Sequence, residues 1–337
     1  MKKKLLVAIV LATMLVSVVA FTACKPTRVE GSYILIAPDG APALAVANLP
    51  SHIAADSISR KIEKKVIAAS LLQDEVTKKD VDMAIVPANL AARIFNASGG
   101  YKILAVVTNG NLYMTSSIPC QVASLQDLNG KMVYSIGQLQ VPDMIFKTLL
   151  TNAGIKYAVG EEAKEGQVTI KYCADGVVAI NALGAAKSKG ELAFGIYGEP
   201  AVTNSKAKGF QEVFDLQSLW AEADGNNAHG YAQAVLIARD KVCEDSAFVA
   251  KLLEAFTANE SSILQNPSGA VKNIKDIYPQ SALQNNMTAE VIGRSNIKTV
   301  KMNADGRTYY ENTLKAVMAI DANLIGGKLP SDAFYIA

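Results

Sequence analysis

Short apolar runs alternate with helical segments along most of this chain. Residues 33–37 form a first apolar run that ends in a Pro-Asp-Gly turn, and residues 81–86 form another that ends at a proline. Short apolar runs bounded by turn residues are typical of buried strands. Strands that alternate with helices predict parallel βαβ units and an α/β fold. The expected strands are residues 33–37, 66–69, 81–86, 101–108, 131–136, 168–172 and 192–197.

The helical segments complete this alternation. Proline in the first turn favours helices that begin near residue 43 and span residues 141–152. From Ser246 onward, apolar residues at helical spacing predict a mostly helical C-terminal part. The strand–turn–helix unit at 81–89 is echoed at 192–200, which indicates two comparable α/β lobes rather than one long sheet.

The N-terminus has the pattern of an export signal. Three lysines precede an apolar run over residues 5–20, and small residues then lead to Cys24. The position of Cys24 resembles the lipobox of bacterial lipoproteins, although lipoboxes usually carry leucine where this chain has Phe21. The alternative is a retained membrane helix, because the run approaches the ~18 residues that suggest a span. We expect residues 1–23 to be a signal peptide, Cys24 to be lipidated and residues 24–31 to be a tether.

Charge and composition exclude a nucleic-acid partner. The chain of 337 residues has 33 basic and 31 acidic side chains, and loss of a signal with three lysines would leave a net charge of −1. Nucleic-acid binding needs a basic surface, and no basic stripe is present. Half of the residues are apolar, which supports a large core. At ~100–200 residues per domain, the length suggests two domains.

The cysteines and histidines predict neither redox nor metal chemistry. Cys120, Cys173 and Cys243 lie far apart, so we expect each to pack as a small buried hydrophobe. His52 and His229 have no acidic or cysteine neighbours at ligand spacing. We therefore expect no metal and no cofactor.

Several motifs follow one another over nearly all of the chain after the signal. They occupy residues 37–42, 81–91, 108–113, 125–131, 198–200 and 325–335. Their order resembles the nitrate/taurine/thiamine-pyrimidine group of ABC-transporter substrate-binding proteins. The resemblance implies a type II periplasmic-binding fold of two α/β lobes with a hinged cleft between them. Lobe 1 would comprise residues 32–117 and 231–337, and lobe 2 residues 118–230, with crossings near 115–119 and 229–233.

The same resemblance implies the extracytoplasmic solute-binding component of an ABC importer. A solute that touches both lobes favours the closed state, and the protein then delivers it to a permease and its ATPase. We expect a monomer that is anchored to the cell membrane through lipid on Cys24. An enzyme is not expected, since the sequence has no Gly-x-Ser-x-Gly elbow and no cluster of cysteines. A sensing module that serves a separate receptor is an alternative.

Carried over by position, the resemblance places the ligand site at the carboxyl ends of strands. The implied ligand-binding residues are Asp39, Gly40, Ala41, Asn89, Asn109, Gln138, Gln140, Tyr197 and Glu199. Carboxamides both donate and accept hydrogen bonds, Tyr197 would stack on a flat ring, and Glu199 would accept from an amine. Turn chemistry is the alternative for Asp39 and Asn109. Helix capping is the alternative for Gln140, as is a favourable helix-dipole position for Glu199.

The residue types at these positions favour a particular class of solute. Gln138 and Gln140 stand where members of the group often carry small hydroxyl residues. Arginine would be the expected anion clamp, but none falls in a loop that we assign to the cleft. The arginines considered are Arg28, Arg60, Arg93, Arg239, Arg294 and Arg307. A heteroaromatic, pyrimidine-like solute is therefore favoured, with a small oxyanion such as an alkylsulfonate or nitrate as the alternative.

Overall fold

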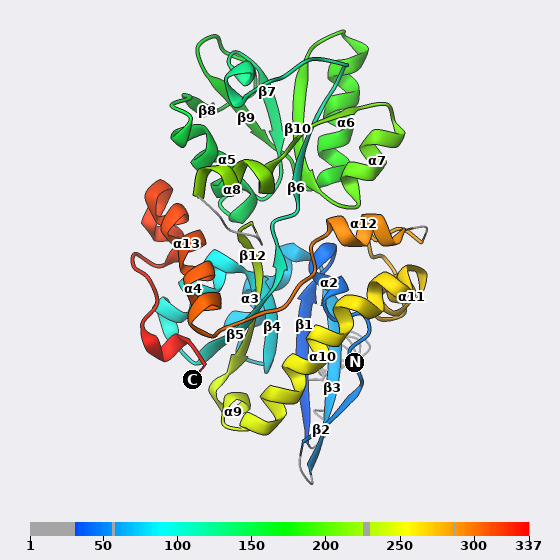
Figure 1. The fold of residues 1–337 in the computed structure, drawn as a ribbon, viewed down its shortest axis with the longest axis vertical. Helices are drawn as coiled ribbons and strands as arrows, with labels where there is room; N and C mark the ends of the chain where they lie inside the picture. The colour runs from blue at the N-terminus through cyan, green and yellow to red at the C-terminus, as the bar shows by residue number, and fades with distance from the viewer. Residues whose placement is uncertain (1–30, 56–57, 225–229, 286, 337) are drawn as a thin grey trace, which may run out of the picture. The chain divides into compact units, whose positions relative to one another are not determined.

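A computed structural model describes residues 31–55, 58–224, 230–285 and 287–336. The expected signal peptide, Cys24 and nearly all of the expected tether lie outside these residues, as does His229. Residues from Tyr33 onward form one compact unit, and the description below concerns that unit. Figure 1 shows its two sheets with their surrounding helices.

Seven strands of the described residues form the sheet of the first lobe. Their order is β13 (Val300–Lys301), β5 (Tyr101–Asn109), β12 (Ala232–Arg239), β4 (Met83–Pro87), β1 (Ser32–Pro38), β3 (Ile58–Ile67) and β2 (His52–Ala55). Strands β1 and β4 are parallel, whereas β12 runs antiparallel between β4 and β5. Residues 234–238 of β12 are all apolar because both faces of the strand are covered there, Val235 on one side and Leu236 on the other.

Helices cover both faces of this first sheet (Figure 1). On one face, α4 (Ala88–Ser98) and α13 (Ala304–Asp321) share a hydrophobic cluster with the strands. On the other face lie α10 (Ser246–Gln265) and α11 (Pro267–Ile277). The shorter elements of this lobe are α2 (Ala41–Leu44), η1 (Ala69–Leu71), α3 (Leu72–Thr77), α9 (Asp240–Cys243), α12 (Ala289–Arg294), η3 (Ala322–Ile325) and η4 (Asp332–Phe334).

Six strands of the described residues form the second sheet. Their order is β11 (Gln211–Asp215), β6 (Leu112–Ser116), β10 (Ala193–Gly198), β7 (Met132–Ser135), β9 (Val168–Tyr172) and β8 (Tyr157–Val159). From β10 to β8 the neighbours are parallel, and β6 is antiparallel to both β10 and β11. The elements packed on this sheet are η2 (Leu125–Leu128), α5 (Val141–Asn152), α6 (Gly176–Ser188), α7 (Ala201–Ala207) and α8 (Leu216–Asp224).

The predicted α/β class and its two lobes are confirmed, although the sheets are mixed rather than parallel. Each expected strand overlaps an observed one, and residues 168–172 coincide with β9. The sequence pattern missed β2, β6, β8, β11, β12 and β13. Several of these are antiparallel strands whose partners lie far away in the sequence. The pairing that defines such a strand has no local sequence signal.

The chain passes between the two sheets earlier than expected. Strand β5 ends at Asn109 and β6 begins at Leu112, so the passage falls at residues 110–111 rather than at 115–119. The difference arises because β6 pairs with β10 and β11 and therefore belongs to the second sheet. On the way back, α8 ends at Asp224 and β12 begins at Ala232.

The first passage is packed too tightly for an additional methyl group. A Cβ on Gly110 would lie 2.8 Å from both Gln217 Cγ and Tyr231 Cε1. Gln217 Oε1 accepts hydrogen bonds from the Leu112 amide (2.7 Å) and from the Tyr231 hydroxyl (3.0 Å), so neither side chain moves freely. We expect Gly110→Ala to lower the free energy of unfolding by about 1–3 kcal/mol in urea titrations, as overpacking does. The control Gly184→Ala adds a methyl to a helix where no atom lies within 4 Å, and it should not destabilise the protein. Equal losses in the two variants would contradict this account.

Candidate functional site

The parallel strands of both sheets bring several chain segments to their carboxyl ends. In the first sheet, β1 leads into Asp39-Gly40 and β4 leads into the start of α4. In the second sheet, the neighbouring strands β7, β9 and β10 lead into the starts of α5, α6 and α7. Loops and helix N-termini at such strand ends form the ligand sites of open α/β sheets.

A pocket of about 350 Å³ lies between α7 of the second lobe and the segment of the first lobe that leads into α12. Its volume is within the ~300–1,000 Å³ typical of small-molecule sites. It is lined by Pro200, Thr203, Asn204, Lys206, Gln284, Met287, Thr288, Glu290 and Val291. A solute in this pocket would contact residues from both lobes.

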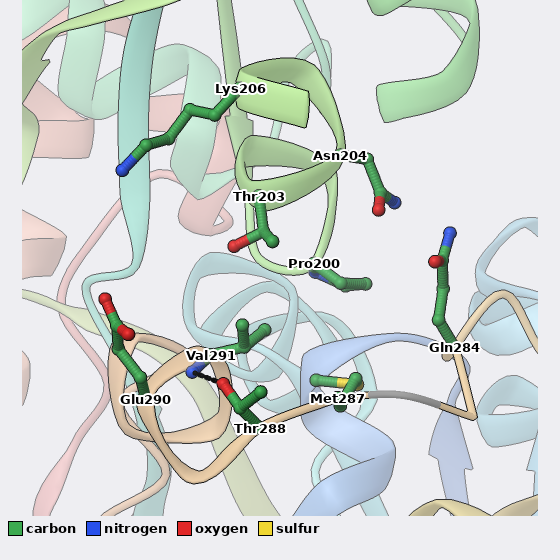
Figure 2. Close-up of a pocket in the computed structure, with 9 residues that line it drawn as sticks. All are labelled: Pro200, Thr203, Asn204, Lys206, Gln284, Met287, Thr288, Glu290 and Val291. Atoms are coloured by element: carbon green, nitrogen blue, oxygen red, sulfur yellow. Dashed lines mark hydrogen bonds between the residues drawn. The ribbon is translucent and has the colours of Figure 1, made fainter. Parts of the chain in front are cut away.

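Figure 2 shows how the polar groups surround an apolar middle. The carboxamides of Asn204 and Gln284 extend toward one another from opposite sides, and Pro200 and Met287 lie between them and the charged residues. The lining contains one cation, Lys206, and one anion, Glu290. The pocket therefore offers carboxamides, hydroxyls and an apolar surface, with no excess of either charge.

The expected ligand residue Asp39 supports the wall of this pocket. Its carboxylate accepts hydrogen bonds from the Ser281 hydroxyl (2.5 Å) and the Ala282 amide (2.8 Å). These bonds hold the start of the segment that carries Gln284. Next to Asp39, Gly40 has a φ of 95°, in the left-handed region that favours glycine, and Ala41 begins the short helix α2.

Glu199 lies at the start of α7 with its carboxylate completely buried. It accepts hydrogen bonds from the Thr203 amide (3.0 Å) and from Nε of Arg294 (2.7 Å). Arg294 ends α12, so this ion pair joins α12 to the second lobe. Arg294 lies in none of the loops that the sequence analysis assigned to the cleft, but its partner Glu199 is itself an expected site residue. The spacing of 95 residues gave the sequence no signal for this contact.

Arg294 is already fully engaged by protein groups. Its guanidinium also contacts Glu212 (2.8 Å) and lies 3.9 Å from the ring centroid of Tyr113. Burial opposes its charge, but the hydrogen bonds to Glu199 and Glu212 outweigh that effect and raise the pKa of Arg294. Burial raises the pKa of Tyr113 to about 12. With two carboxylates on one guanidinium, Arg294 has little positive charge left for an anionic solute.

Two other expected ligand-binding residues, Asn109 and Tyr197, use their polar groups in hydrogen bonds within the protein. Asn109 donates to the Lys298 carbonyl (2.9 Å) and accepts from the Tyr309 hydroxyl (2.9 Å). Tyr197 is completely buried, and its hydroxyl is hydrogen-bonded to that of Thr115. In this conformation both side chains serve packing and internal hydrogen bonding.

The loop before α5 contains the two expected glutamines, and both are exposed. Between them, Leu139 has a φ of 60° and donates its amide to Asp143 Oδ2 (3.0 Å). The carbonyl of Leu139 accepts from Asn89 Nδ2 across the two lobes (3.2 Å). Asn89 and this loop are thus brought together, whereas Asp39 and Glu199 bind other segments, residues 281–282 and Arg294 respectively.

Exposed aliphatic side chains lie beyond the carboxyl ends of the parallel strands in the second sheet. Leu139 follows β7 and is 51% exposed, and Val177 and Val178 follow the neighbouring strand β9 with exposures of 60% and 45%. Leu71 of η1 follows β3 in the first lobe and is 53% exposed. The Asp39 amide donates to the Ile67 carbonyl, which places the end of β3 beside the end of β1. Aliphatic groups thus accompany the polar ones at the strand ends of both lobes.

The pocket residues contributed by α7 and α12 were missed by the sequence analysis. Pro200 belongs to a segment that carried the family resemblance, but Asn204, Gln284 and Met287 stand in no motif. The sequence did contain one signal for Asn204, because this residue lies in a helix that begins just after a strand. Gln284 and Met287 reach the pocket through the packing of a loop, which sequence periodicity does not predict.

The described residues offer few groups for metal or thiol chemistry. Within them, no group of three or more His, Cys, Asp or Glu side chains could hold a metal ion. Cys120, Cys173 and Cys243 are free thiols, and each packs against a hydrophobic cluster while remaining partly exposed. Burial raises the pKa of Cys243 to about 11, so it is protonated at neutral pH. In the same part of the chain, no helix combines the length and apolar character that a membrane span requires.

Comparison with solved structures identifies the fold. An ABC transporter structure from Parabacteroides distasonis matches with a TM-score of 0.70 and 19% identity, over 91% of this chain and 99% of that one. The periplasmic aliphatic sulphonate binding protein SsuA from Escherichia coli matches with a TM-score of 0.61 and 12% identity, over 89% and 90%. The alkanesulfonate-binding protein SsuA from Xanthomonas axonopodis pv. citri, bound to MOPS, gives 0.57 and 11%, over 92% and 99%.

These similarities define the class of fold. The chain has the two-lobed α/β fold of ABC-transporter substrate-binding proteins, the type II periplasmic-binding fold. No protein-family model matches the sequence, and no curated protein sequence matches it either.

Proposed function

We propose that this protein is the extracytoplasmic solute-binding component of an ABC importer. It captures a small molecule between its lobes, closes on it, and delivers it to a permease driven by an ATPase. Residues 32–117 and 231–337 would act as lobe 1 and residues 118–230 as lobe 2, apart from β6, which pairs within the second sheet. Lipid on Cys24 would hold the protein, as a monomer, at the cell membrane.

The observation that carries this proposal is a pocket whose walls come from both lobes. Thr203 and Asn204 belong to α7 and Pro200 directly precedes it, while Gln284 and Met287 belong to the segment before α12. A solute held by both walls stabilises the closed arrangement by its differential binding, which is how lobe closure is driven. The fold of the matched binding proteins supports the same function.

The chemistry of the site favours a neutral or weakly basic heteroaromatic solute. The lining charges of the pocket balance, and Arg294 is paired with two carboxylates. Exposed aliphatic groups such as Leu139 and Val177 offer contact to the faces of a flat ring. The second candidate is an alkylsulfonate, because two of the structural neighbours are described as sulfonate-binding proteins.

Native mass spectrometry of freshly purified protein tests the proposal. We expect a retained small molecule, or stoichiometric binding of an added solute in calorimetric titrations with pyrimidines and alkylsulfonates. The fluorescence of the single tryptophan, Trp220, provides a second readout. Its ring packs against that of Tyr231, with 5.8 Å between the centroids. The Tyr231 carbonyl in turn accepts from the Gly110 amide, at the passage between the lobes. Closure should therefore change the fluorescence of Trp220.

Two outcomes would count against parts of this proposal. If no small molecule is retained and no solute binds, solute capture is contradicted. Tight binding of an alkylsulfonate without any response to pyrimidines would leave the importer function intact and reverse the order of the two solute classes.

A further inference from the structure

We infer that Asn89 and Gln233 form a hydrogen-bond-accepting subsite for N–H or O–H donors of the solute. This inference rests on the proposed function and narrows the solute to a neutral or cationic molecule that carries donors. It disfavours anions that have only acceptor atoms. Both side chains end in a buried carbonyl oxygen that, among the described residues, has no hydrogen-bond donor.

The orientation of the Asn89 amide is fixed by its surroundings. Asn89 is 2% exposed, and its Nδ2 donates to the carbonyls of Leu139 (3.2 Å) and Leu324 (3.4 Å). Because both partners are acceptors, a flipped amide would place oxygen against oxygen. The free acceptor is therefore Oδ1, at the first turn of α4.

Gln233 occupies an irregular position in β12. Ala232 pairs with Asn109 and Ala234 pairs with Thr108, so Gln233 is an extra residue relative to β5. Such bulges bend a strand and redirect side chains, and they are frequent next to functional sites. Its Oε1 is buried without a donor, although the residue as a whole is partly exposed.

Strand pairing brings the two acceptors to the same end of the first sheet. Ala234 pairs with Pro87 of β4, so Gln233 lies beside the residues that open α4, among them Asn89. Figure 1 shows β12, β4 and α4 side by side in the first lobe. This is the carboxyl end of β4, close to where β12 returns from the second lobe. The contact between Asn89 and Leu139 shows that the second lobe reaches this place.

The two oxygens select a solute by its hydrogen-bonding pattern. A buried acceptor without a donor is unfavourable, and a ligand donor that reaches it restores the lost hydrogen bond. Amines, amides, amidines and amino-substituted rings carry such donors. Nitrate and sulfonates have only acceptors, so they would place oxygen against oxygen here. Sites built to hydrogen-bond one group discriminate strongly against analogues that lack it.

Calorimetric titrations against two sets of solutes test this inference. One set carries donors and contains cytosine, 4-aminopyrimidine, simple amides and benzamidine, and the other contains nitrate and ethanesulfonate. We expect binding in the donor set. Gln233→Met, which keeps the length of the side chain, should weaken that binding by about tenfold or more. Gln265→Met, at an exposed position at the end of α10, should have no effect.

A second measurement does not depend on how the variants fold. For the wild-type protein, replacing the donor of the bound solute with a methyl group should cost about tenfold in affinity. The inference is overturned if binding is confined to nitrate and ethanesulfonate, or if neither Gln233→Met nor the methylated analogue weakens binding. Either result leaves solute capture standing. Absence of any binding in both sets would contradict solute capture itself, and the inference would fall with it.

Discussion

Replacement of Arg294 with methionine is expected to lower the free energy of unfolding by about 3–5 kcal/mol, the usual cost of removing one partner of a buried ion pair. The Glu199 carboxylate has no exposed surface and would be left facing a neutral side chain, with only the Thr203 amide still donating to it. Glu212 would also lose its contact with the guanidinium (2.8 Å). The effect should be large because Arg294 joins α12 to residues of the second lobe.

Urea unfolding of three variants separates this effect from general charge loss. Lys206→Met removes a 50%-exposed partner of Glu212, 3.4 Å away, and should change stability by less than about 1 kcal/mol. The double variant Arg294→Met/Glu199→Gln should recover part of the loss, because no buried charge remains unpaired. If Arg294→Met unfolds at the same urea concentration as the wild type, the ion pair does not hold the lobes as described.

Replacement of Asp143 with leucine is the second change for which we expect a loss of about 3–5 kcal/mol. This carboxylate is 1% exposed and accepts from Lys147 Nζ (3.0 Å), the Tyr172 hydroxyl (2.6 Å) and the Leu139 amide (3.0 Å). Burial, and then the hydrogen bond to Asp143, raises the pKa of Tyr172. Without Asp143, the 12%-exposed Lys147 would lack a counter-charge and the loop before α5 would lose its anchor.

The matched control for Asp143 is a carboxylate with the same helical spacing to its lysine. Asp276 pairs with Lys272 at i,i+4, but both side chains are mostly exposed, so Asp276→Leu should cost less than about 1 kcal/mol. Unfolding in urea measures both variants. Calorimetry should also show weaker solute binding for Asp143→Leu, because Gln138, Leu139 and Gln140 depend on the anchored loop. Unchanged stability and unchanged binding together would contradict this role.

Some of the site could be predicted from sequence, and some of it could not. Strand ends followed by helix starts predicted a site at Asp39, Asn89 and Glu199, and the structure places these residues after β1, β4 and β10. The sequence could not show that Asp39 binds the segment after α11 or that Glu199 binds Arg294, because these partners lie 242 and 95 residues away. Sequence patterns record which residues can form hydrogen bonds, but the packing of distant elements decides which bonds are made.

The sequence by itself determined the α/β class and the positions of most parallel strands, with β8 as an exception. Buried parallel strands appear as apolar runs between turns, and this signal is local. Only the tertiary structure decided the place where the chain passes between the lobes, the pairing of β6 and β12, and the pocket formed by α7 and the residues before α12. The physical reason is that antiparallel pairing and interlobe contacts join residues far apart in the chain, where no periodicity links one partner to the other.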